Sequence, residues 1–194
     1  MLTDADAVAL PKVLLHDHLD GGLRASTVID LAAEIGWTLP TTDLDDLQAW
    51  FTAGAAARDL GKYLATFEHT GAVMQHPEHI ERVAAEAAVD LAEDGVVYAE
   101  IRFAPELHQQ QGLELDAVVS AVTSGLRRVE GEATSPIIVN VILCAMRTEL
   151  RSLDIAQLVD RLLAWVDKVV AFDLAGAETG FPPSLHADAL AFAR

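Results

Sequence analysis

The sequence predicts an α/β protein built on a parallel sheet, and three observations lead to this fold class. Short apolar runs alternate with long segments of helical periodicity along the 194 residues. The apolar runs are nearly continuous in Val, Ile and Leu, which is typical of parallel strands that helices bury on both faces. Apolar residues make up 52% and charged residues 22% of the chain, which is enough for a core and excludes a disordered chain.

The first elements follow from an apolar run and from capping residues. Residues 13–18 (VLLHDH) form the first expected strand. Ser26 is a suitable N-cap for a helix that ends at residue 35, just before Gly36. After a polar stretch, a short helix is expected at 44–51.

Two longer helices follow. Residues 59–75 are amphipathic, with Leu60, Tyr63, Leu64 and Phe67 at helical spacing. Such a stripe on its own indicates core packing. The next helix is expected at 78–94, because Pro77 suits a first helical turn and Gly95 suits a helix end.

The second half of the chain repeats the alternation three times. Strands are expected at 96–103, 137–145 and 169–174. The helices between and after them are expected at 114–131, from a cap at Ser152 to about residue 165, and at 184–193.

Charge and cysteine usage exclude several classes of protein. The formal charge of −17 argues against binding to a nucleic-acid backbone and favours a small-molecule partner. The single cysteine, Cys144, excludes a disulfide within the chain and a cysteine-based structural zinc site. The longest apolar stretch, 137–146, is far shorter than the roughly 20 residues of a membrane helix. With an acidic N-terminus, these features predict a cytoplasmic protein without a membrane partner.

Polar residues gather where the expected strands end, which is where α/β sheets place their sites, in doubly wound folds and in barrels alike. The Gly-rich fingerprint of a dinucleotide site follows none of the strands. Gly21 and Gly22 could contact a phosphate, so a phosphate-binding domain stays a distant alternative. The residues in question are His16, Asp17, His18 and Asp20, then Glu100 and Arg102, then Arg147, and finally Asp173 and Glu178.

The segment HDHLDGG at 16–22 indicates a metal site. Two residues that are two apart on a strand point to the same face, so His16 and His18 can converge on one divalent ion, typically zinc. The competing interpretation is one packed histidine and one that forms hydrogen bonds in a loop.

Five segments, in this order, resemble the adenosine deaminase family of the amidohydrolase superfamily, which also includes AMP deaminases. The resemblance covers nearly the whole chain. The segments are LLHDHLDGGLRASTVIDLA, DLGKYLATFEHTGAVM, VVYAEIRFAPELH, VNVILCAMR and VVAFDLAGAETGFPP.

The resemblance implies a metal-dependent-hydrolase TIM (β/α)8 barrel, of which residues 1–194 would be the N-terminal half with about four strand–helix units. A helical insertion at about 43–94 would gate the pocket. It also implies a zinc ion on His16 and His18, with His18 near the substrate. Asp20 would bind the ribose and Gly176 would offer its backbone N–H to the purine. The pocket lining and gate would be Leu60, Tyr63, Leu64, Phe67 and Met146.

The implied activity is zinc-dependent hydrolysis of adenosine, a purine nucleoside, to inosine and ammonia. Adenine or a modified adenosine is the alternative substrate, and a non-catalytic half barrel is the alternative from another class. The family's HAGE motif, its later histidine and its late aspartate pair are absent from the 194 residues. No residue of this chain is therefore expected to act as the general acid or base, and the isolated chain is expected to be inactive. A complementary C-terminal fragment or a second copy would complete the barrel.

Other polar residues are expected to be structural. Glu100 and Arg102 are expected to form a buried ion pair that organises the barrel, and Arg147 and Asp173 to belong to the same kind of network. The remaining histidines are expected on the surface or in packing contacts, and they are His69, His76, His79, His108 and His186.

Overall fold

Four parallel strands form one sheet in a computed structural model, which describes residues 3, 8–132 and 136–193, apart from the side chains of residues 60, 62, 131 and 132. The strands are β1 (Lys12–His18), β2 (Val96–Phe103), β3 (Ile138–Met146) and β4 (Val169–Ala175). All neighbours pair in parallel, and their order in the sheet is β1-β2-β3-β4. Each strand is therefore added on the same side of the previous one. A doubly wound sheet would reverse direction, so this order is that of a barrel.

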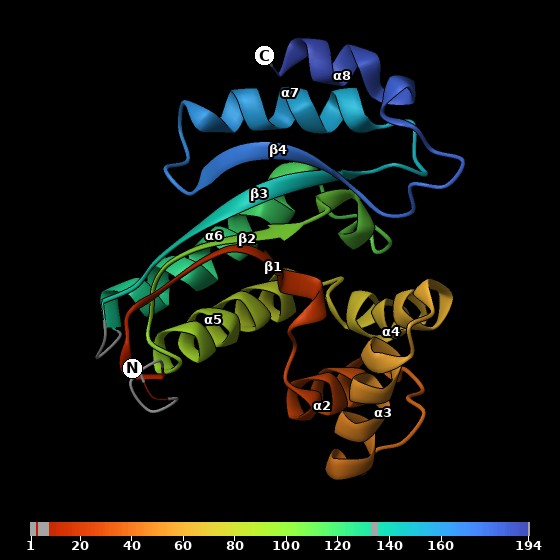
Figure 1. Cartoon of the computed structure of the whole chain (residues 1–194), viewed down its shortest axis with the longest axis vertical. Helices are drawn as coiled ribbons and strands as arrows, with labels where there is room; N and C mark the ends of the chain where they lie inside the picture. Colours follow the sequence, from red (N-terminus) through yellow and green to blue (C-terminus); the bar gives the residue numbers. More distant parts are fainter. Residues whose placement is uncertain (1–2, 4–7, 133–135, 194) are drawn as a thin grey trace.

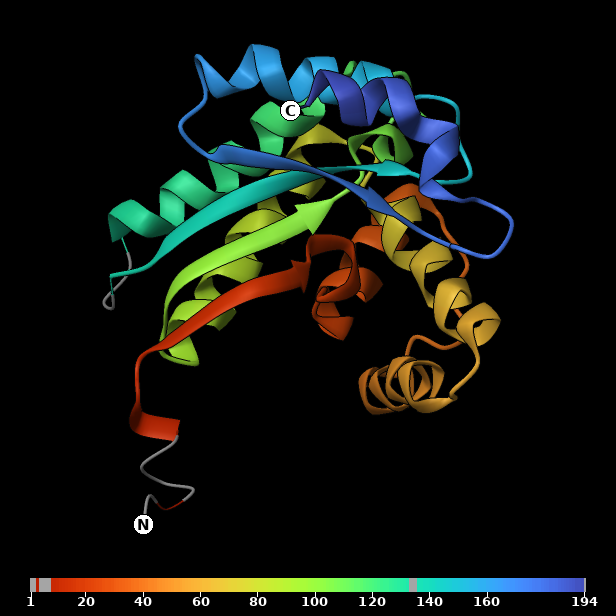
Figure 2. The ribbon, with the colours of Figure 1, turned by 45° about the horizontal axis from the view of Figure 1, so that its top comes forward.

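Helices alternate with the strands as the sequence predicts. Helices α5, α6 and α7 contact the sheet, and α8 packs on α7 (Figures 1 and 2). The helices are α2 (Ala25–Ile35), α3 (Leu44–Ala56), α4 (Leu60–Val73), α5 (Pro77–Glu93), α6 (Leu115–Glu132), α7 (Ser152–Leu163) and α8 (Ala187–Phe192). Short 3-10 turns are η1 (Leu19–Gly21), η2 (Pro105–His108) and η3 (Pro183–His186).

The segment at 43–94, expected as one helical insertion, falls into two parts. Helix α5 packs along α6 and belongs to the layer that covers the sheet. Helices α3 and α4 pack on each other and on α2, beyond the carboxyl ends of the strands (Figure 1). Of the expected insertion, α3 and α4 therefore lie outside the layer that covers the sheet.

Two predicted helix caps are wrong. Helix α2 begins at Ala25 with Arg24 as its N-cap, and α7 begins at Ser152 with Arg151 as its N-cap. Ser26 lies inside the first turn of α2. The Ser152 hydroxyl lies instead 2.9 Å from Nδ1 of His186, so it is used in packing η3 against α7. Helix α3 also runs to Ala56, beyond the expected end at 51.

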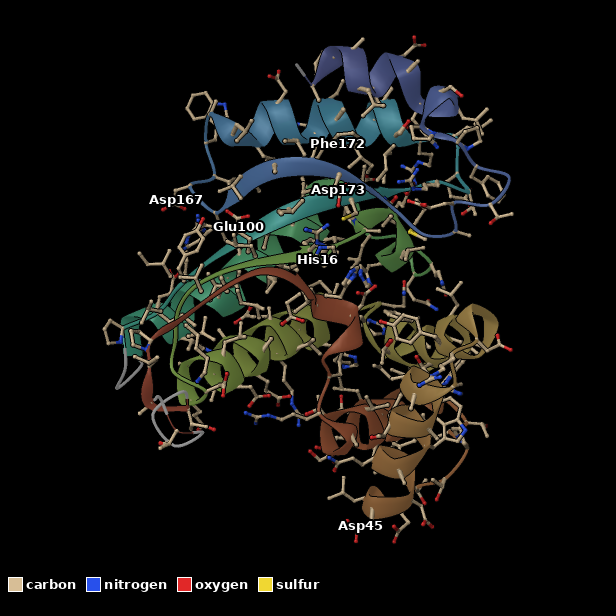
Figure 3. The ribbon with its side chains drawn as sticks, viewed as in Figure 1. His16, Asp45, Glu100, Asp167, Phe172 and Asp173 are labelled. Carbon is tan, nitrogen blue, oxygen red and sulfur yellow. The ribbon has the colours of Figure 1, made fainter. Side chains whose placement is uncertain are left out.

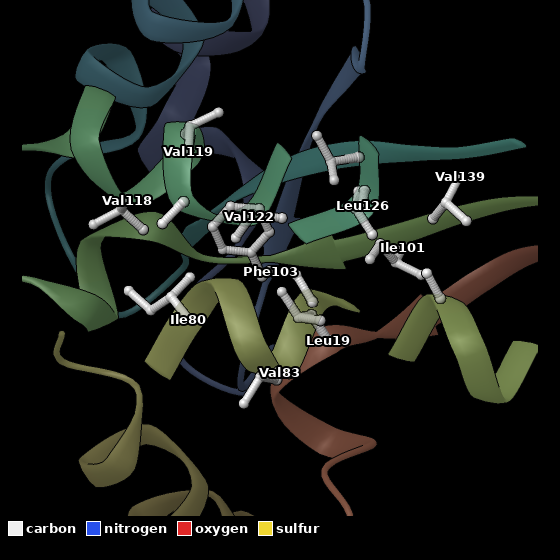
Figure 4. Packing of buried hydrophobic residues seen from close by; sticks show 14 of the residues in the cluster. Leu19, Ile80, Val83, Ile101, Phe103, Val118, Val119, Val122, Leu126 and Val139 are labelled. Carbon is white, nitrogen blue, oxygen red and sulfur yellow. The ribbon is translucent and has the colours of Figure 1, made fainter. Parts of the chain in front are cut away.

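The outer face of the sheet, on which the helices pack, forms the hydrophobic core. Ile101 and Phe103 of β2 and Val139 of β3 are almost fully buried there. They meet apolar side chains of α5 and α6, among them Ile80 and Val122 (Figure 4). This face matches the apolar strand pattern of the sequence.

The inner face of the sheet differs from the expectation that both faces are buried. Val13 and Ile138 are 61% and 54% exposed, because no helix of the described residues covers this side. The face also carries polar side chains, and Figure 3 shows His16, Glu100 and Asp173 along it. β1 and β4 are the two edges of the sheet. No helix of the described residues is long and apolar enough to cross a membrane.

Candidate active site

A cavity of about 260 Å³ lies at the carboxyl ends of the strands, beneath α4. Seven residues that were expected at a substrate pocket line it together. Five further lining residues were not predicted. The predicted seven are His18, Asp20, Tyr63, Leu64, Phe67, Met146 and Gly176, and the other five are Phe103, Ala104, Leu107, Cys144 and Ala175. The side chain of Leu60 lies outside the described residues.

His16 and His18 lie at the end of β1 with their ring centroids 5.4 Å apart and their planes tilted by 46°. The pairing of β1 with β2 shifts register between Leu14 and Asp17, so the strand is irregular in the segment that carries His16, whereas His18 follows it in regular pairing with Arg102. Within the described residues, neither imidazole ring has a hydrogen-bond partner, so their nitrogens are available to a ligand.

Burial lowers the pKa of His18, and the neighbouring His16 and Arg102 lower it further, against the opposing charges of Asp17 and Asp173. The neutral imidazole that results is the form that binds a metal ion. Zinc in catalytic sites usually has three protein ligands and a water. In the described residues no cluster of three or more His, Cys, Asp or Glu side chains is arranged for a metal. The pair of histidines therefore fits part of a zinc site, and further ligands would have to come from elsewhere.

Asp20 follows β1 in the turn η1 and is 8% exposed. Burial raises the pKa of its carboxyl to about 6. Its Oδ1 is buried and has no hydrogen-bond partner in the described part of the chain, although Asp20 lines the cavity. A buried acceptor without a partner is rare in native proteins, so this oxygen is suited to a donor on a ligand.

Helix α4 forms the apolar roof of the cavity. The rings of Tyr63 and Phe67 pack edge to face with centroids 5.1 Å apart. Tyr63 and Leu64 are 37% and 40% exposed although they line the cavity, so this end of α4 stands between the cavity and solvent.

Gly176 forms the opposite wall, after β4. Its φ of +91° is one that residues with a side chain rarely adopt. A Cβ at this position would lie 2.9 Å from Cε of Met146. The backbone conformation therefore favours glycine here, and the lack of a side chain leaves the backbone of residue 176 open to the cavity.

The predicted ion pair between Glu100 and Arg102 is wrong. Arg102 forms its ion pair with Asp173 on β4, and Glu100 accepts a hydrogen bond of 2.8 Å from the hydroxyl of Tyr98. β3 lies between the strands of this pair, and both charges act on the buried thiol of Cys144 on that strand. Arg147 pairs with Glu178 at 3.2 Å.

The five other histidines have structural surroundings. His79 and His186 each have partners for both ring nitrogens, and His108 contacts the carbonyl of Met74 at 3.0 Å through Nδ1. His69 accepts a hydrogen bond from the indole N–H of Trp37. His76 packs against the ring of His79.

Some of the unpredicted lining residues carried a signal in the sequence. Cys144 precedes Met146 by two residues on β3, so strand alternation alone would have placed both on one face. Leu107 comes from η2, an irregular turn whose inward side the sequence does not mark.

The sequence of this chain is similar to those of known adenosine deaminases. The family model described as adenosine deaminase matches residues 11–194. The chain is 53% identical over 186 residues to adenosine deaminase 1 of Streptomyces coelicolor, covering 94% of this chain and 46% of that protein. It is 51% identical over 191 residues to an adenosine deaminase of Mycobacterium avium, covering 95% and 51% respectively. The chain thus spans about half the length of the curated relatives it matches.

The fold of this chain is also similar to those of solved deaminases and of a related amidohydrolase. An adenine deaminase from Arthrobacter aurescens superposes with a TM-score of 0.78 at 27% identity, over 95% of this chain and 54% of that one. An Arabidopsis ADAL complexed with IMP gives 0.78 at 26% identity, over 95% and 55%. A Burkholderia amidohydrolase with bound zinc gives 0.78 at 26%, over 100% and 52%. The barrel fold and the family predicted from the sequence are confirmed, and the chain belongs to the adenosine deaminase family.

Proposed function

We propose that this chain carries the first part of the active site of an enzyme that hydrolyses adenosine to inosine and ammonia. The observation that carries the proposal is the cavity at the strand ends. It joins a neutral His18 to a buried, unpartnered Asp20 oxygen under an apolar roof. An apolar pocket with a few converging polar groups is the usual form of a small-molecule site.

His16 and His18 are the residues that would hold a zinc ion. A bound zinc ion would lower the pKa of a water molecule to about 7, which provides a nucleophile at neutral pH. The solved amidohydrolase with bound zinc supports this assignment. The two adjacent rings, both without hydrogen bonds in the described residues, support it from this chain.

Asp20 and Gly176 would orient the nucleoside. The unpartnered Asp20 oxygen would accept a hydrogen bond from a ribose hydroxyl, and the backbone N–H of Gly176 would donate to a ring nitrogen of the purine. Tyr63, Leu64 and Phe67 would cover the purine with Met146 beneath it, and so exclude water from the reacting ring.

The chain spans about half of its curated relatives. We infer that the remaining metal ligands and the general acid and base lie in the half of the relatives' length that these 194 residues do not cover, whether that half continues this chain or comes from a complementary fragment or a second copy. The isolated chain would then be inactive, and α3 and α4 would act as the gate. A cytoplasmic location is part of the same proposal and is supported by the acidic composition.

Adenine and modified adenosines are the alternative substrates, and solved relatives include an adenine deaminase and an N6-methyl-AMP deaminase. Asp20 favours a nucleoside, because free adenine has no hydroxyl to meet its buried oxygen. Relative rates on adenosine, adenine and N6-methyl-AMP, measured on the chain with its complement, would decide between them.

Zinc affinity tests the metal assignment without an activity assay. The chain and three variants, His16→Ala, His18→Ala and His76→Ala, would compete for zinc with a chromophoric chelator. Loss of either strand histidine should weaken binding at least tenfold, whereas His76→Ala should leave it unchanged because its ring lies outside the site. Equal affinity in all four proteins would contradict the assignment.

The intact mass of every polypeptide in the purified sample tests the composition of the complete site. A second chain that co-purifies with the 20.8 kDa species would supply the expected complement. A single species without deaminase activity would restrict the function of this chain to a binding or assembly role.

A further inference from the structure

Strand β3 extends beyond its last pair with β2. Pairing between β2 and β3 ends at Phe103 and Leu143, whereas pairing of β3 with β4 continues to Met146 and Ala175. Successive N–H groups of a strand point to opposite sides. Arg147 donates to the carbonyl of Ala175 at 2.8 Å, so the N–H of Met146 points to the side that β2 has left.

Where β2 no longer pairs with β3, the carboxylate of Glu106 provides the hydrogen-bond acceptor for β3. Its Oε1 accepts the hydrogen bond of the Met146 N–H at 2.6 Å. Glu106 belongs to η2, the turn that directly follows β2, and the same segment contributes Ala104 and Leu107 to the cavity. One hydrogen bond thus connects the η2 wall of the cavity to the Met146 wall.

The position of Glu106 leaves part of its carboxyl group buried without a hydrogen bond. Its second oxygen, Oε2, is buried and has no hydrogen-bond partner in the described part of the chain. Burial raises the pKa of the Glu106 carboxyl; the Met146 N–H and Arg151 oppose this, and Glu149 and Asp154 add to it. A half-buried carboxyl with one buried, unpartnered oxygen is unfavourable by itself. The hydrogen bond with the Met146 N–H accounts for its placement.

Movement of Met146 would change the shape of the cavity. Its Cε lies 2.9 Å from the place that a Cβ of residue 176 would take, so the Met146 side chain packs directly against the backbone of the loop after β4. A shift of the Met146 backbone would therefore also move the side chain that packs against Gly176.

We propose that Glu106, which is not among the residues that line the cavity, is a positioning residue that sets the separation of the η2 and Met146 walls and thereby the size of ring that the cavity accepts. The part that concerns ring selection rests on the proposed function. The part that concerns the walls rests on this chain alone.

The methionine methyl groups provide a direct test. The chain has three methionines, so a sample labelled with [methyl-13C]methionine gives few signals, and Met146→Leu assigns the relevant one. Glu106→Leu removes the acceptor and should move or broaden the Met146 signal by more than its linewidth at pH 7. Glu106→Gln keeps an oxygen for the Met146 N–H and should leave the signal close to its original position.

Two controls separate positioning from charge and from misfolding. Glu149→Gln removes an equal charge from an exposed neighbour whose side chain does not bond Met146, and it should not move the signal. The Met74 signal reports an intact fold. A Met146 signal that is unchanged in Glu106→Leu, or that moves as far in Glu149→Gln, would overturn the proposal.

A pH series keeps the test decisive if Glu106→Leu does not fold. The Met146 signal should titrate as the pH falls from 7 to 4, and part of that movement should be lost in Glu106→Gln, which cannot titrate. Identical curves in the two proteins would overturn the proposal. Addition of adenosine to the chain together with its complement then tests the proposed function separately. A Met146 signal that responds to Glu106 but not to adenosine would retain the positioning role and reject the purine site.

Discussion

The two faces of the sheet are built on different principles. On the outer face, Ile101, Val139 and Leu143 are closed off from water by α5, α6 and α7. On the inner face, the same strands present Glu100, Asn140 and other half-exposed polar groups beside exposed apolar ones such as Ile138. The outer face therefore carries most of the apolar burial that stabilises the chain, and the inner face carries the polar groups of the candidate site.

The difference follows from strand alternation. Neighbouring residues of β2 and β3 point to opposite faces, so apolar packing can be satisfied at every second position while the rest remain free for polar groups. Site residues gather where this inner face reaches the carboxyl ends of the strands. A substitution should therefore have a large effect on unfolding on one face and a small one on the other, even within one strand.

The largest expected effect is on the outer face of β3. Leu143→Ala should lower the free energy of unfolding by about 2–5 kcal/mol, because Leu143 is fully buried and its loss leaves a cavity. Ile138→Ala, on the same strand but 54% exposed, should change it by less than about 0.5 kcal/mol. Urea unfolding of both variants, with the m-value checked for constancy, measures the contrast. Equal losses would show that the inner face is packed as tightly as the outer one.

The second effect concerns His108, which lies in the core beside Phe103. Complete burial lowers its pKa to about 4, while the Met74 carbonyl opposes this shift. Below pH 6.5 the unfolded chain binds a proton that the folded chain refuses, so stability should fall by about 2–3 kcal/mol between pH 7 and pH 4 from this group alone. Urea unfolding across this range would compare the chain with His108→Asn, which keeps a donor near the carbonyl but does not titrate.

The variant His108→Asn should lose stability less steeply with falling pH than the unmodified chain does. His76→Asn is the matched control, since its ring packs beside His79 and is not fully buried, and it should keep the original slope. Parallel pH curves for the chain and His108→Asn would mean that His108 is protonated equally in the folded and unfolded states.

The sequence predicted most of the fold, because periodicity depends on neighbours along the chain. The apolar runs placed all four strands within about a residue of their bounds, and Pro77 and Gly95 marked the ends of α5 correctly. Caps were predicted less well, since a hydroxyl is free to choose a tertiary partner. Ser152 bonds His186 from a segment more than 30 residues away, which no local pattern indicates.

The candidate site could be predicted from the sequence only in part. The motif at 16–18 predicted a pair of converging histidines, and the two rings do lie side by side at the end of β1. The resemblance to a family predicted Asp20, the roof and the Met146 and Gly176 walls of the cavity. Contacts between strands were beyond reach. Arg102 on β2 can pair with Asp173 on β4 because the register of the parallel strands brings the two side chains level with each other across β3. That register cannot be read from the sequence. Glu106 was missed because a carboxylate in an irregular turn has no periodic signal.

The third expected effect is on the inner face, at the ion pair of Arg102 and Asp173. Asp173→Asn keeps the acceptor for the backbone N–H of Leu174 but removes the charge opposite a largely buried guanidinium. The side chain of Asp173 is 39% exposed, so water screens the pair, and a loss of about 1–2 kcal/mol is expected rather than that of a fully buried pair. Unfolding at low and high salt measures it, and the loss should shrink as salt is added.

Glu178→Gln is the control for that prediction, because Glu178 also follows β4 and pairs with an arginine, but its side chain is 80% exposed. Its loss should stay within about 0.5 kcal/mol. If the two variants lose the same stability, the inner-face pair is no better shielded than a surface pair, and the contrast between the two faces is weaker than their burial indicates.

The smallest expected effect is at the amino-terminal part of the inner face, where Asn140 donates to the hydroxyl of Tyr98 at 3.2 Å and Tyr98 donates to Glu100 at 2.8 Å. Tyr98→Phe should cost only about 0.5–1.5 kcal/mol, because water can replace the lost bonds at a half-exposed site. A double-mutant cycle of Tyr98→Phe with Glu100→Gln measures the coupling between the two side chains. A coupling above about 2 kcal/mol would exceed the usual net value of a solvated hydrogen bond. It would mean that this part of the inner face is shielded from water almost as well as the outer core.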